Sequence, residues 1–311
     1  MIVVSDPSFE PETHAFLERV GTQDGPLTYD ELLTVRVLEP DPELAGKPEP
    51  IHCRAEVLLP LTDRSLRVRI YRPELTQPRP ILLWLHGGGF VAGTLDDVDV
   101  TCTRISSKAG VVVVSLDYRL APEHPYPAAL DDTVDALGWL AAHGELFGGD
   151  GRVAAGGQSA GANLVAAASL KARDDGGPAP ARQVLCYPTL DFDMRSQSHN
   201  EDDGLLSHSR MDWYHKMYLA GQRVTPYAAP LTSPDLSRLP PALILSAGHD
   251  PLRHDARHYA ERLRGAGVDV RHFEYDATPH AFLNFPGAFT AANRATDDIA
   301  DDLITHFRLP R

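Results

Sequence analysis

Cysteine is scarce in this chain of 311 residues, which contains three of them, Cys53, Cys102 and Cys186. Their odd number and wide spacing exclude a disulfide framework, and the spacing does not match that of a zinc site. Free cysteines of this kind behave as small hydrophobic residues. We therefore expect these three side chains to lie in the interior, with no metal bound.

Long hydrophobic runs are also missing. No segment approaches the roughly 18 consecutive apolar residues that a membrane helix needs. The first residues, Met-Ile-Val-Val-Ser-Asp-Pro, have no basic region followed by an apolar segment, as a secretory signal would. The sequence thus predicts a cytoplasmic protein without a membrane span.

Basic residues are in short supply. The chain has 29 Lys and Arg against 43 Asp and Glu, which gives a net charge of −14. Nucleic acids and anionic membranes attract proteins through basic patches, so we expect neither as a partner. The same charge opposes strongly anionic substrates and leaves neutral small molecules as the favoured ligands.

The hydrophobic pattern predicts an α/β fold with about eight strands in one mostly parallel sheet. Residues 53–57 and 66–70 alternate polar and apolar side chains across a short link, which favours an antiparallel pair. Later segments are continuously apolar, as in parallel strands buried on both faces, and helical segments separate them. The later strands are expected at 81–85, 111–116, 153–155, 184–186, 242–245 and 268–275, and the helices at 99–108, 128–143, 160–173, 255–265 and 291–307.

Residues 189–240 interrupt this alternation. They contain one helical segment, 211–218, in which Trp213 and Met217 share a face. Two modest helical stretches, 14–20 and 29–35, precede the first strand. The interruption indicates either a helical excursion that packs on the sheet or a lid over a pocket, since long insertions in compact domains are often functional.

Residues 157–161 read Gly-Gln-Ser-Ala-Gly and lie between a predicted strand and a predicted helix. A tight strand-to-helix turn presents its serine above the sheet, and the glycines permit that turn. The start of the helix adds free N–H groups that suit a developing negative charge. We therefore interpret Ser159 as a nucleophile, the alternative being a serine that caps a helix.

Residues 86–90 read His-Gly-Gly-Gly-Phe directly after a predicted strand. Consecutive glycines let backbone N–H groups face a cavity, and such donors stabilise a tetrahedral intermediate. We predict an oxyanion hole formed by the N–H groups of Gly87, Gly88 and Ala160. A flexible loop is the alternative.

A serine nucleophile needs a base, and the base needs a third group to orient it. His280 follows the last predicted strand, and Asp250 follows the strand before it, so both lie where open α/β sheets place their sites. Asp255, five residues further on, is the alternative acid. The resulting order Ser159, Asp250, His280 is that of α/β-hydrolases. The other histidines of predicted helices and strands are expected to face solvent: His215, His254, His258, His272 and His306.

The sequence resembles the α/β-hydrolases of the hormone-sensitive lipase group of carboxylesterases over residues 72–308. The resemblance implies an α/β-hydrolase fold with a helical cap built from residues 1–45 and 190–225, over a core of 46–189 and 226–311. It implies the same triad and oxyanion hole, no cofactor and, as in similar proteins, a homodimer. The matching blocks are 86–90, 157–161, 250–253 (Asp-Pro-Leu-Arg), 280–282 (His-Ala-Phe) and 117–129 (Asp-Tyr-Arg-Leu-Ala-Pro-Glu-His-Pro-Tyr-Pro-Ala-Ala).

Glu123, Gln158 and Ala281 lie within these blocks, and His254 directly follows one of them. The long block suggests a structural loop in which Glu123 is a buried hydrogen-bonding acid rather than a catalyst. The group usually has an acidic residue or Thr at the position of Gln158, Gly at that of Ala281 and an acidic residue at that of His254. All three members of the predicted triad are present.

These observations favour a serine carboxylesterase that hydrolyses short- to medium-chain acyl esters. An amide, formamide or lactone hydrolase with the same triad is the alternative, followed by a small-molecule binding protein on the same fold, because fold does not fix function. Substrate contacts are expected from five apolar residues: Phe90, Leu205, Trp213, Met217 and Phe282.

Overall fold

A single mixed sheet organises the chain. The computed structural model describes residues 2–4, 9–21, 25–74 and 76–310, and within them nine strands pair in the order β1-β9-β8-β7-β6-β4-β5-β3-β2. Strand β3 is antiparallel to both of its neighbours, and every other pair is parallel. The strands are β1 (Ile2–Val4), β2 (Cys53–Pro60), β3 (Ser65–Arg72), β4 (Arg79–Leu85), β5 (Val112–Leu116), β6 (Gly149–Gln158), β7 (Gln183–Cys186), β8 (Ala242–Ala247) and β9 (Val270–Tyr275).

The eight strands expected from the sequence correspond to β2 through β9, so the predicted fold class is confirmed. The structure adds β1, which pairs in parallel with β9 at the edge of the sheet. Three residues are too few to show a period of two, so hydrophobic patterning gave no signal for this strand.

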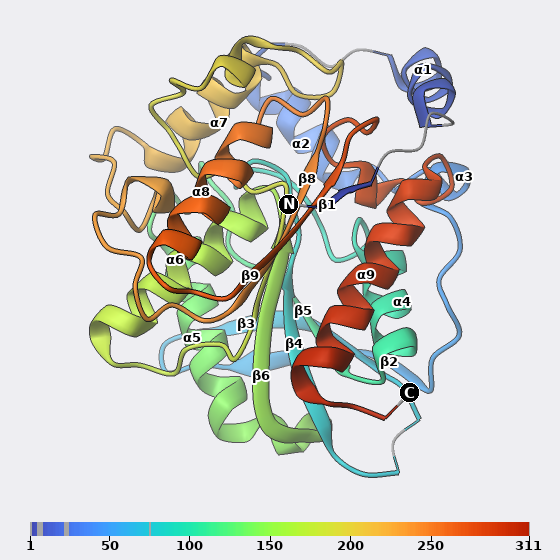
Figure 1. Cartoon of the computed structure of the whole chain (residues 1–311), viewed down its shortest axis with the longest axis vertical. Coiled ribbons are helices and arrows are strands. Elements are labelled where there is room, and N and C mark those ends of the chain that lie inside the picture. Colours follow the sequence, from blue (N-terminus) through green and yellow to red (C-terminus); the bar gives the residue numbers. More distant parts are fainter. Residues whose placement is uncertain (1, 5–8, 22–24, 75, 311) are drawn as a thin grey trace.

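Helices cover both faces of the sheet (Figure 1). Helices α5, α6 and α8 contribute to one buried apolar cluster, and α4 and α9 to another. The continuous apolar sequences of the central strands reflect this burial on two faces. The helices are α1 (Phe9–Val20), α2 (Tyr29–Val37), α3 (Pro42–Ala45), α4 (Asp99–Ala109), α5 (Ala128–His143), α6 (Ala160–Asp175), α7 (His208–Leu219), α8 (Arg253–Gly265) and α9 (Thr290–Phe307).

The carboxyl ends of four strands meet at one edge of the sheet. Leu85 at the end of β4 is opposite Gly157 in β6, and Ala247 at the end of β8 is opposite Tyr275 at the end of β9. The loops that follow these strands therefore start side by side. This edge lies near the top of Figure 1, where α2 and α7 are also found.

Helix α2 is attached to the loop after β4. Its Arg36 donates from Nε to the carbonyl of Val91 at 2.7 Å and from a terminal nitrogen to the carbonyl of Ala121 at 2.6 Å. Leu32 of α2 is buried with Val91 and Ala121 in one small apolar cluster. The N-terminal segment thus packs directly on the glycine-rich loop.

Glu123 corrects one expectation. It is exposed rather than buried, although it does accept hydrogen bonds from Arg36 and Tyr29, both at 2.8 Å. These bonds, that from Arg36 foremost, lower the pKa of Glu123 to about 2. The buried acid near this block is Asp132, which accepts from the backbone N–H of Arg119. The sequence indicated an acid in a structural loop, but it did not indicate whether its side chain would face the interior or the solvent.

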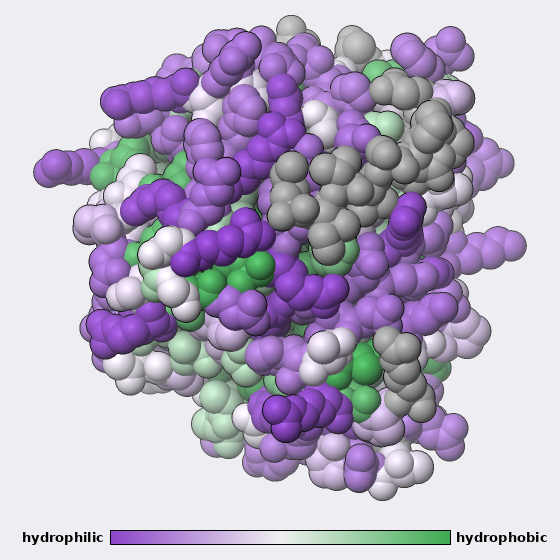
Figure 2. Space-filling view, viewed as in Figure 1, coloured by the Kyte–Doolittle hydropathy of each residue, from purple (hydrophilic) through white to green (hydrophobic). Residues whose placement is uncertain are grey.

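Polar side chains dominate the face shown in Figure 2, where hydrophobic residues form small separate patches. Among the helices of the described residues, none combines the length and the apolar character needed to cross a membrane. Cys102 and Cys186 are buried, as expected, whereas Cys53 on edge strand β2 is only half-buried.

Candidate active site

Ser159 occupies the turn between β6 and α6. Its φ of 52° is in the left-handed region, which costs free energy for a residue other than glycine. The turn is tight because a Cβ on Gly161 would lie 2.3 Å from the carbonyl oxygen of Leu85. The Ser159 side chain makes no capping hydrogen bond, which removes the alternative of a serine that caps the helix.

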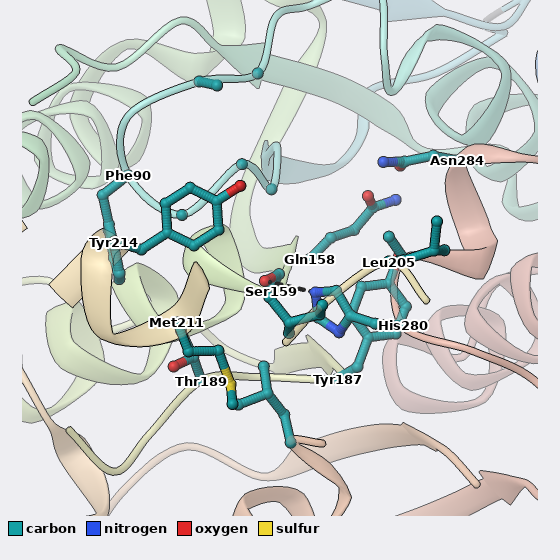
Figure 3. A pocket seen from close by; sticks show the side chains of 18 of the residues that line it. Phe90, Gln158, Ser159, Tyr187, Thr189, Leu205, Met211, Tyr214, His280 and Asn284 are labelled. Atoms are coloured by element: carbon teal, nitrogen blue, oxygen red, sulfur yellow. Dashed lines mark hydrogen bonds between the residues drawn. The ribbon is translucent and has the colours of Figure 1, made fainter. Parts of the chain in front are cut away.

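The structure brings Ser159, His280 and Asp250 into one hydrogen-bonded chain. Oγ of Ser159 lies 3.0 Å from Nε2 of His280 (Figure 3), and Nδ1 of His280 lies 2.7 Å from Oδ2 of Asp250. The other oxygen of Asp250 accepts from the N–H of Leu252 at 2.8 Å. An ionised carboxylate only accepts, so Nδ1 donates to Asp250 and Nε2 is left to accept from the Ser159 hydroxyl.

The alternative acid, Asp255, has a different set of partners. It is fully buried and accepts from Nε2 of His199 at 2.8 Å and from the N–H groups of Leu190 and Asp191. These bonds join the start of α8 to the segment that follows β7. Asp255 therefore anchors that segment and does not contact His280.

A second carboxylate contacts His280. Oδ2 of Asp203 accepts from the backbone N–H of His280, and Oδ1 accepts from the N–H groups of Leu205 and Leu206. Burial lowers the pKa of His280, but the charge and hydrogen bond of Asp250 and the charge of Asp203 outweigh it, so the pKa is raised above its ordinary value of 6.5. Burial, followed by the charge of Asp250, raises the pKa of Asp203 itself.

Sequence reasoning missed Asp203. The run Asp202-Asp203-Gly204 resembles an ordinary polar turn. Its partner His280 is 77 residues away along the chain. A pattern of residue types in one sequence contains no signal for such a contact.

The glycine-rich loop lies against the serine. A Cβ on Gly87 would be 3.5 Å from Cβ of Ser159, and Ala160 is the first residue of α6. Within the described residues, no backbone carbonyl outside the helices and strands accepts from the N–H groups of Gly87, Gly88 or Ala160. These three N–H groups, two of them in residues that line one pocket with Ser159, are therefore available to bind an oxygen atom.

A cavity of about 250 Å³ opens above Ser159 and His280. Its wall contains apolar side chains from α2, the glycine-rich loop and α7, together with a few polar ones. The polar residues include Gln158, Thr189, His215 and Asn284, and the apolar ones include Val35, Phe90, Leu205, Leu206, Met211 and Leu252. Among the described residues, no group of three or more His, Cys, Asp or Glu side chains is placed to hold a metal ion.

Proteins of similar sequence include several that are named as hydrolases and esterases. Residues 82–284 match the family described as alpha/beta hydrolase fold. The carboxylesterase NlhH of Mycobacterium tuberculosis is 40% identical over 245 residues, which is 76% of each chain. The ethyl acetate hydrolase of Pseudomonas putida is 32% identical, with 96% of this chain and 99% of that protein covered.

Solved structures that are similar to this chain include an ester hydrolase. An ester hydrolase from the metagenome of Lake Arreo, in complex with a derivative of bipyridine phosphonate, superimposes with a TM-score of 0.87 at 33% identity. The match covers 96% of this chain and 98% of that one. The chain belongs to the α/β-hydrolase family, among the carboxylesterases of the hormone-sensitive lipase group.

Two of the five expected substrate contacts of this esterase, Phe90 and Leu205, line the pocket. Trp213 and Met217 do not: they pack against Leu32 and its neighbours on the other face of α7. Met211, Tyr214 and His215 occupy the face of α7 that borders the cavity, so the helical period was right and the choice of face was wrong.

Phe282, the fifth expected contact, has no exposed surface and lies in the hydrophobic core. Its ring packs against those of Tyr187 and Tyr275. The rings of Tyr187 and His280 in turn form an edge-to-face contact, with 5.0 Å between their centroids. Phe282 thus packs in the core next to the loop that carries His280, and it does not line the pocket.

His215 and His272 also depart from expectation, because both are buried rather than solvent-facing. Nε2 of His215 lies 3.3 Å from Oγ1 of Thr189, and burial lowers the pKa of His215 to about 3. The esterase pocket therefore has a neutral imidazole in its wall at pH 7. His272 hydrogen-bonds Ser246 inside the sheet, where burial lowers its pKa to about 4.

Helix α7 approaches the glycine-rich loop of the esterase at Gly89. A Cβ on this residue would lie 2.3 Å from Cγ of Tyr214, so the aromatic ring rests on the glycine backbone. The position of Tyr214 at the pocket wall is visible in Figure 3. Glycine is required here to admit the ring.

Proposed function

We propose that this esterase is a serine carboxylesterase whose catalytic triad is Ser159, His280 and Asp250. The observation that supports it is the hydrogen-bonded chain of these three residues at the base of a cavity. A hydroxyl next to a base, which is itself oriented by an acid, is the arrangement that activates a serine.

In this mechanism His280 accepts the Ser159 proton at Nε2 while Oγ attacks the ester carbonyl. The N–H groups of Gly87, Gly88 and Ala160 bind the oxyanion of the tetrahedral intermediate. His280 then gives the proton to the leaving alcohol, and an acyl-enzyme remains. Water activated by His280 hydrolyses it, while Asp250 stabilises the imidazolium in both halves of the reaction.

Short- to medium-chain acyl esters are the proposed substrates. A cavity of about 250 Å³ lies just below the 300–1,000 Å³ typical of pockets that enclose drug-sized ligands. Its predominantly apolar wall suits alkyl groups. The relative named ethyl acetate hydrolase has a small ester in its name, which supports the same size class.

We propose further that residues 1–45 and 190–225 form a cap over a core of 46–189 and 226–311. Helix α2 from the first segment contributes Val35 to the pocket wall, and α7 from the second contributes Met211, Tyr214 and His215. Substrate would then enter between α2 and α7.

The decisive experiment compares Ser159→Ala with the wild type on p-nitrophenyl esters from acetyl to palmitoyl. The wild type should prefer the shorter chains, and the variant should lose at least about 10⁴-fold in kcat. Ser169→Ala is the matched control, because that serine lies in the same helix and bonds the carbonyl of Val165. Turnover by Ser159→Ala that resembles the wild type would contradict the proposal.

A further inference from the structure

Gln158, the residue before the proposed nucleophile, has a side-chain amide with no hydrogen-bond partner in the described part of the chain. It is 1% exposed and lines the pocket. Within the described residues, neither Oε1 nor Nε2 has a hydrogen-bond partner. Buried polar side chains in folded proteins are nearly always paired, so an unpaired amide requires an explanation.

A second amide in the same wall has a similar deficit. Oδ1 of Asn284 is buried and has no partner among the described residues. Figure 3 shows the amide ends of Gln158 and Asn284 pointing into the same part of the pocket, on one side of Ser159. Two side-chain amides with unused hydrogen-bonding capacity thus border this part of the pocket.

Neighbouring polar side chains of the described residues do not form hydrogen bonds with these two amides. Asp97, which also lines the pocket, is engaged because its Oδ2 accepts from the N–H of Thr94 at 2.8 Å. Gln183 offers a comparison inside the sheet: it is equally buried and its Oε1 also has no partner among the described residues, but its Nε2 donates to the carbonyl of Pro240 at 2.8 Å. Gln183 is thereby fixed to the backbone, whereas the amide of Gln158 faces the cavity.

We propose that Gln158, assisted by Asn284, binds a neutral hydroxyl or carbonyl group that the substrate carries close to its scissile ester. The proposal rests on the function proposed above and specifies the substrate as a hydroxy or keto ester. An amide donates and accepts, so it matches a hydroxyl in either orientation. A plain alkyl group at the same place leaves the buried amide unpaired, which disfavours that substrate.

The test uses esters that differ by one hydroxyl in place of one methyl. Ethyl 3-hydroxybutyrate is paired with ethyl 3-methylbutyrate on the acyl side, and 2-hydroxyethyl butyrate with propyl butyrate on the alcohol side. The measured quantity is the ratio of kcat/KM within each pair. Replacing the amide with an alkyl group, Gln158→Leu, should lower this ratio by about tenfold or more in one series.

The ratio cancels any general effect of the substitution on the adjacent serine. Gln183→Leu is the matched control and should keep the wild-type ratio in both series. Asn284→Leu should lower the ratio in the same series as Gln158→Leu. Equal ratios in the wild type and in Gln158→Leu, in both series, would overturn the proposal.

If Gln158→Leu does not fold, a second variant tests the same proposal. Gln158→Glu keeps the size of the side chain, but an ionised carboxylate cannot donate, so it should disfavour ethyl 3-oxobutyrate relative to ethyl 3-methylbutyrate. An unchanged ratio there also overturns the proposal. If the wild type hydrolyses no ester at all, the proposed function fails; if it hydrolyses both members of each pair and no variant changes the ratios, the inference about Gln158 alone fails.

Discussion

The backbone N–H of His280 donates a hydrogen bond to Oδ2 of Asp203, with 2.5 Å between the two heavy atoms. The other oxygen of Asp203 accepts from the N–H groups of Leu205 and Leu206, and Leu205 and Leu206 line the pocket. One buried carboxylate thus joins the loop that carries the proposed base to the segment before α7. The position of the base and the shape of the pocket depend on the same side chain.

This relationship predicts a pH effect. A protonated His280 cannot accept the serine proton, so kcat/KM should fall as the pH drops through the pKa of His280. Because that pKa is raised, the acid limb of the wild type should have its midpoint above 6.5. Asp203→Asn removes one of the charges that raise the pKa, and the limb should therefore move to lower pH.

The matched control for this experiment is Asp202→Asn. Asp202 is exposed and accepts from the N–H of Gly204, so its substitution should leave the acid limb in place. If Asp203 only held the loop in shape, its replacement would change kcat and KM without moving the limb. An unmoved limb in Asp203→Asn would therefore reject the electrostatic role.

A second prediction concerns stability. Asp255 and His199 form a fully buried pair, and Asp255 also accepts two backbone N–H groups. Breaking a buried pair of this kind costs about 3–5 kcal/mol, because the remaining group is left without compensation. Asp255→Asn should lower the free energy of unfolding by roughly that amount, measured by urea denaturation.

Asp175→Asn provides the comparison for Asp255→Asn. Asp175 is exposed and pairs with Lys171 one helical turn away, so its replacement should cost about 0.5 kcal/mol or less. Similar losses in the two variants would show that the buried pair has no special contribution to stability.

Ala281 leads to a third prediction. Its φ is 59°, a conformation that costs an alanine about 1–2 kcal/mol and a glycine almost nothing. Glycine also loses more entropy on folding, by about 0.5–1 kcal/mol. Ala281→Gly should therefore raise the free energy of unfolding by about 0.5–1 kcal/mol in the same denaturation assay.

Two alanines test whether the backbone conformation is the cause. Ala220 at the end of α7 has a φ of 47°, so Ala220→Gly should be stabilising to a similar degree. Ala141 is an exposed residue of helix α5, where glycine is unfavourable, so Ala141→Gly should destabilise by up to about 1 kcal/mol. Stabilisation of all three variants alike would contradict the explanation.

Strands β2 to β9 and the three proposed triad residues could be placed from the sequence because each depends on local order. A buried strand followed by a turn puts the next residue at the carboxyl edge of the sheet, which was enough to single out Ser159, Asp250 and His280. The contacts of Asp203 and the burial of His215 depend on how distant segments pack. Helical periodicity placed Trp213 and Met217 on one face but could not say which face would border the pocket.

The contact between Gly89 and the ring of Tyr214 sets a limit on exchange of parts between related enzymes. Gly89 belongs to the loop after β4, and Tyr214 belongs to α7, which is distant in sequence. The two elements can approach this closely because Gly89 has no Cβ atom that would collide with the ring. A chimaera that receives α7 from a homologue replaces the residue at position 214 but keeps Gly89 of the recipient. Compatibility between donor and recipient would have to be judged at residue 89 before any side chain of the pocket is considered.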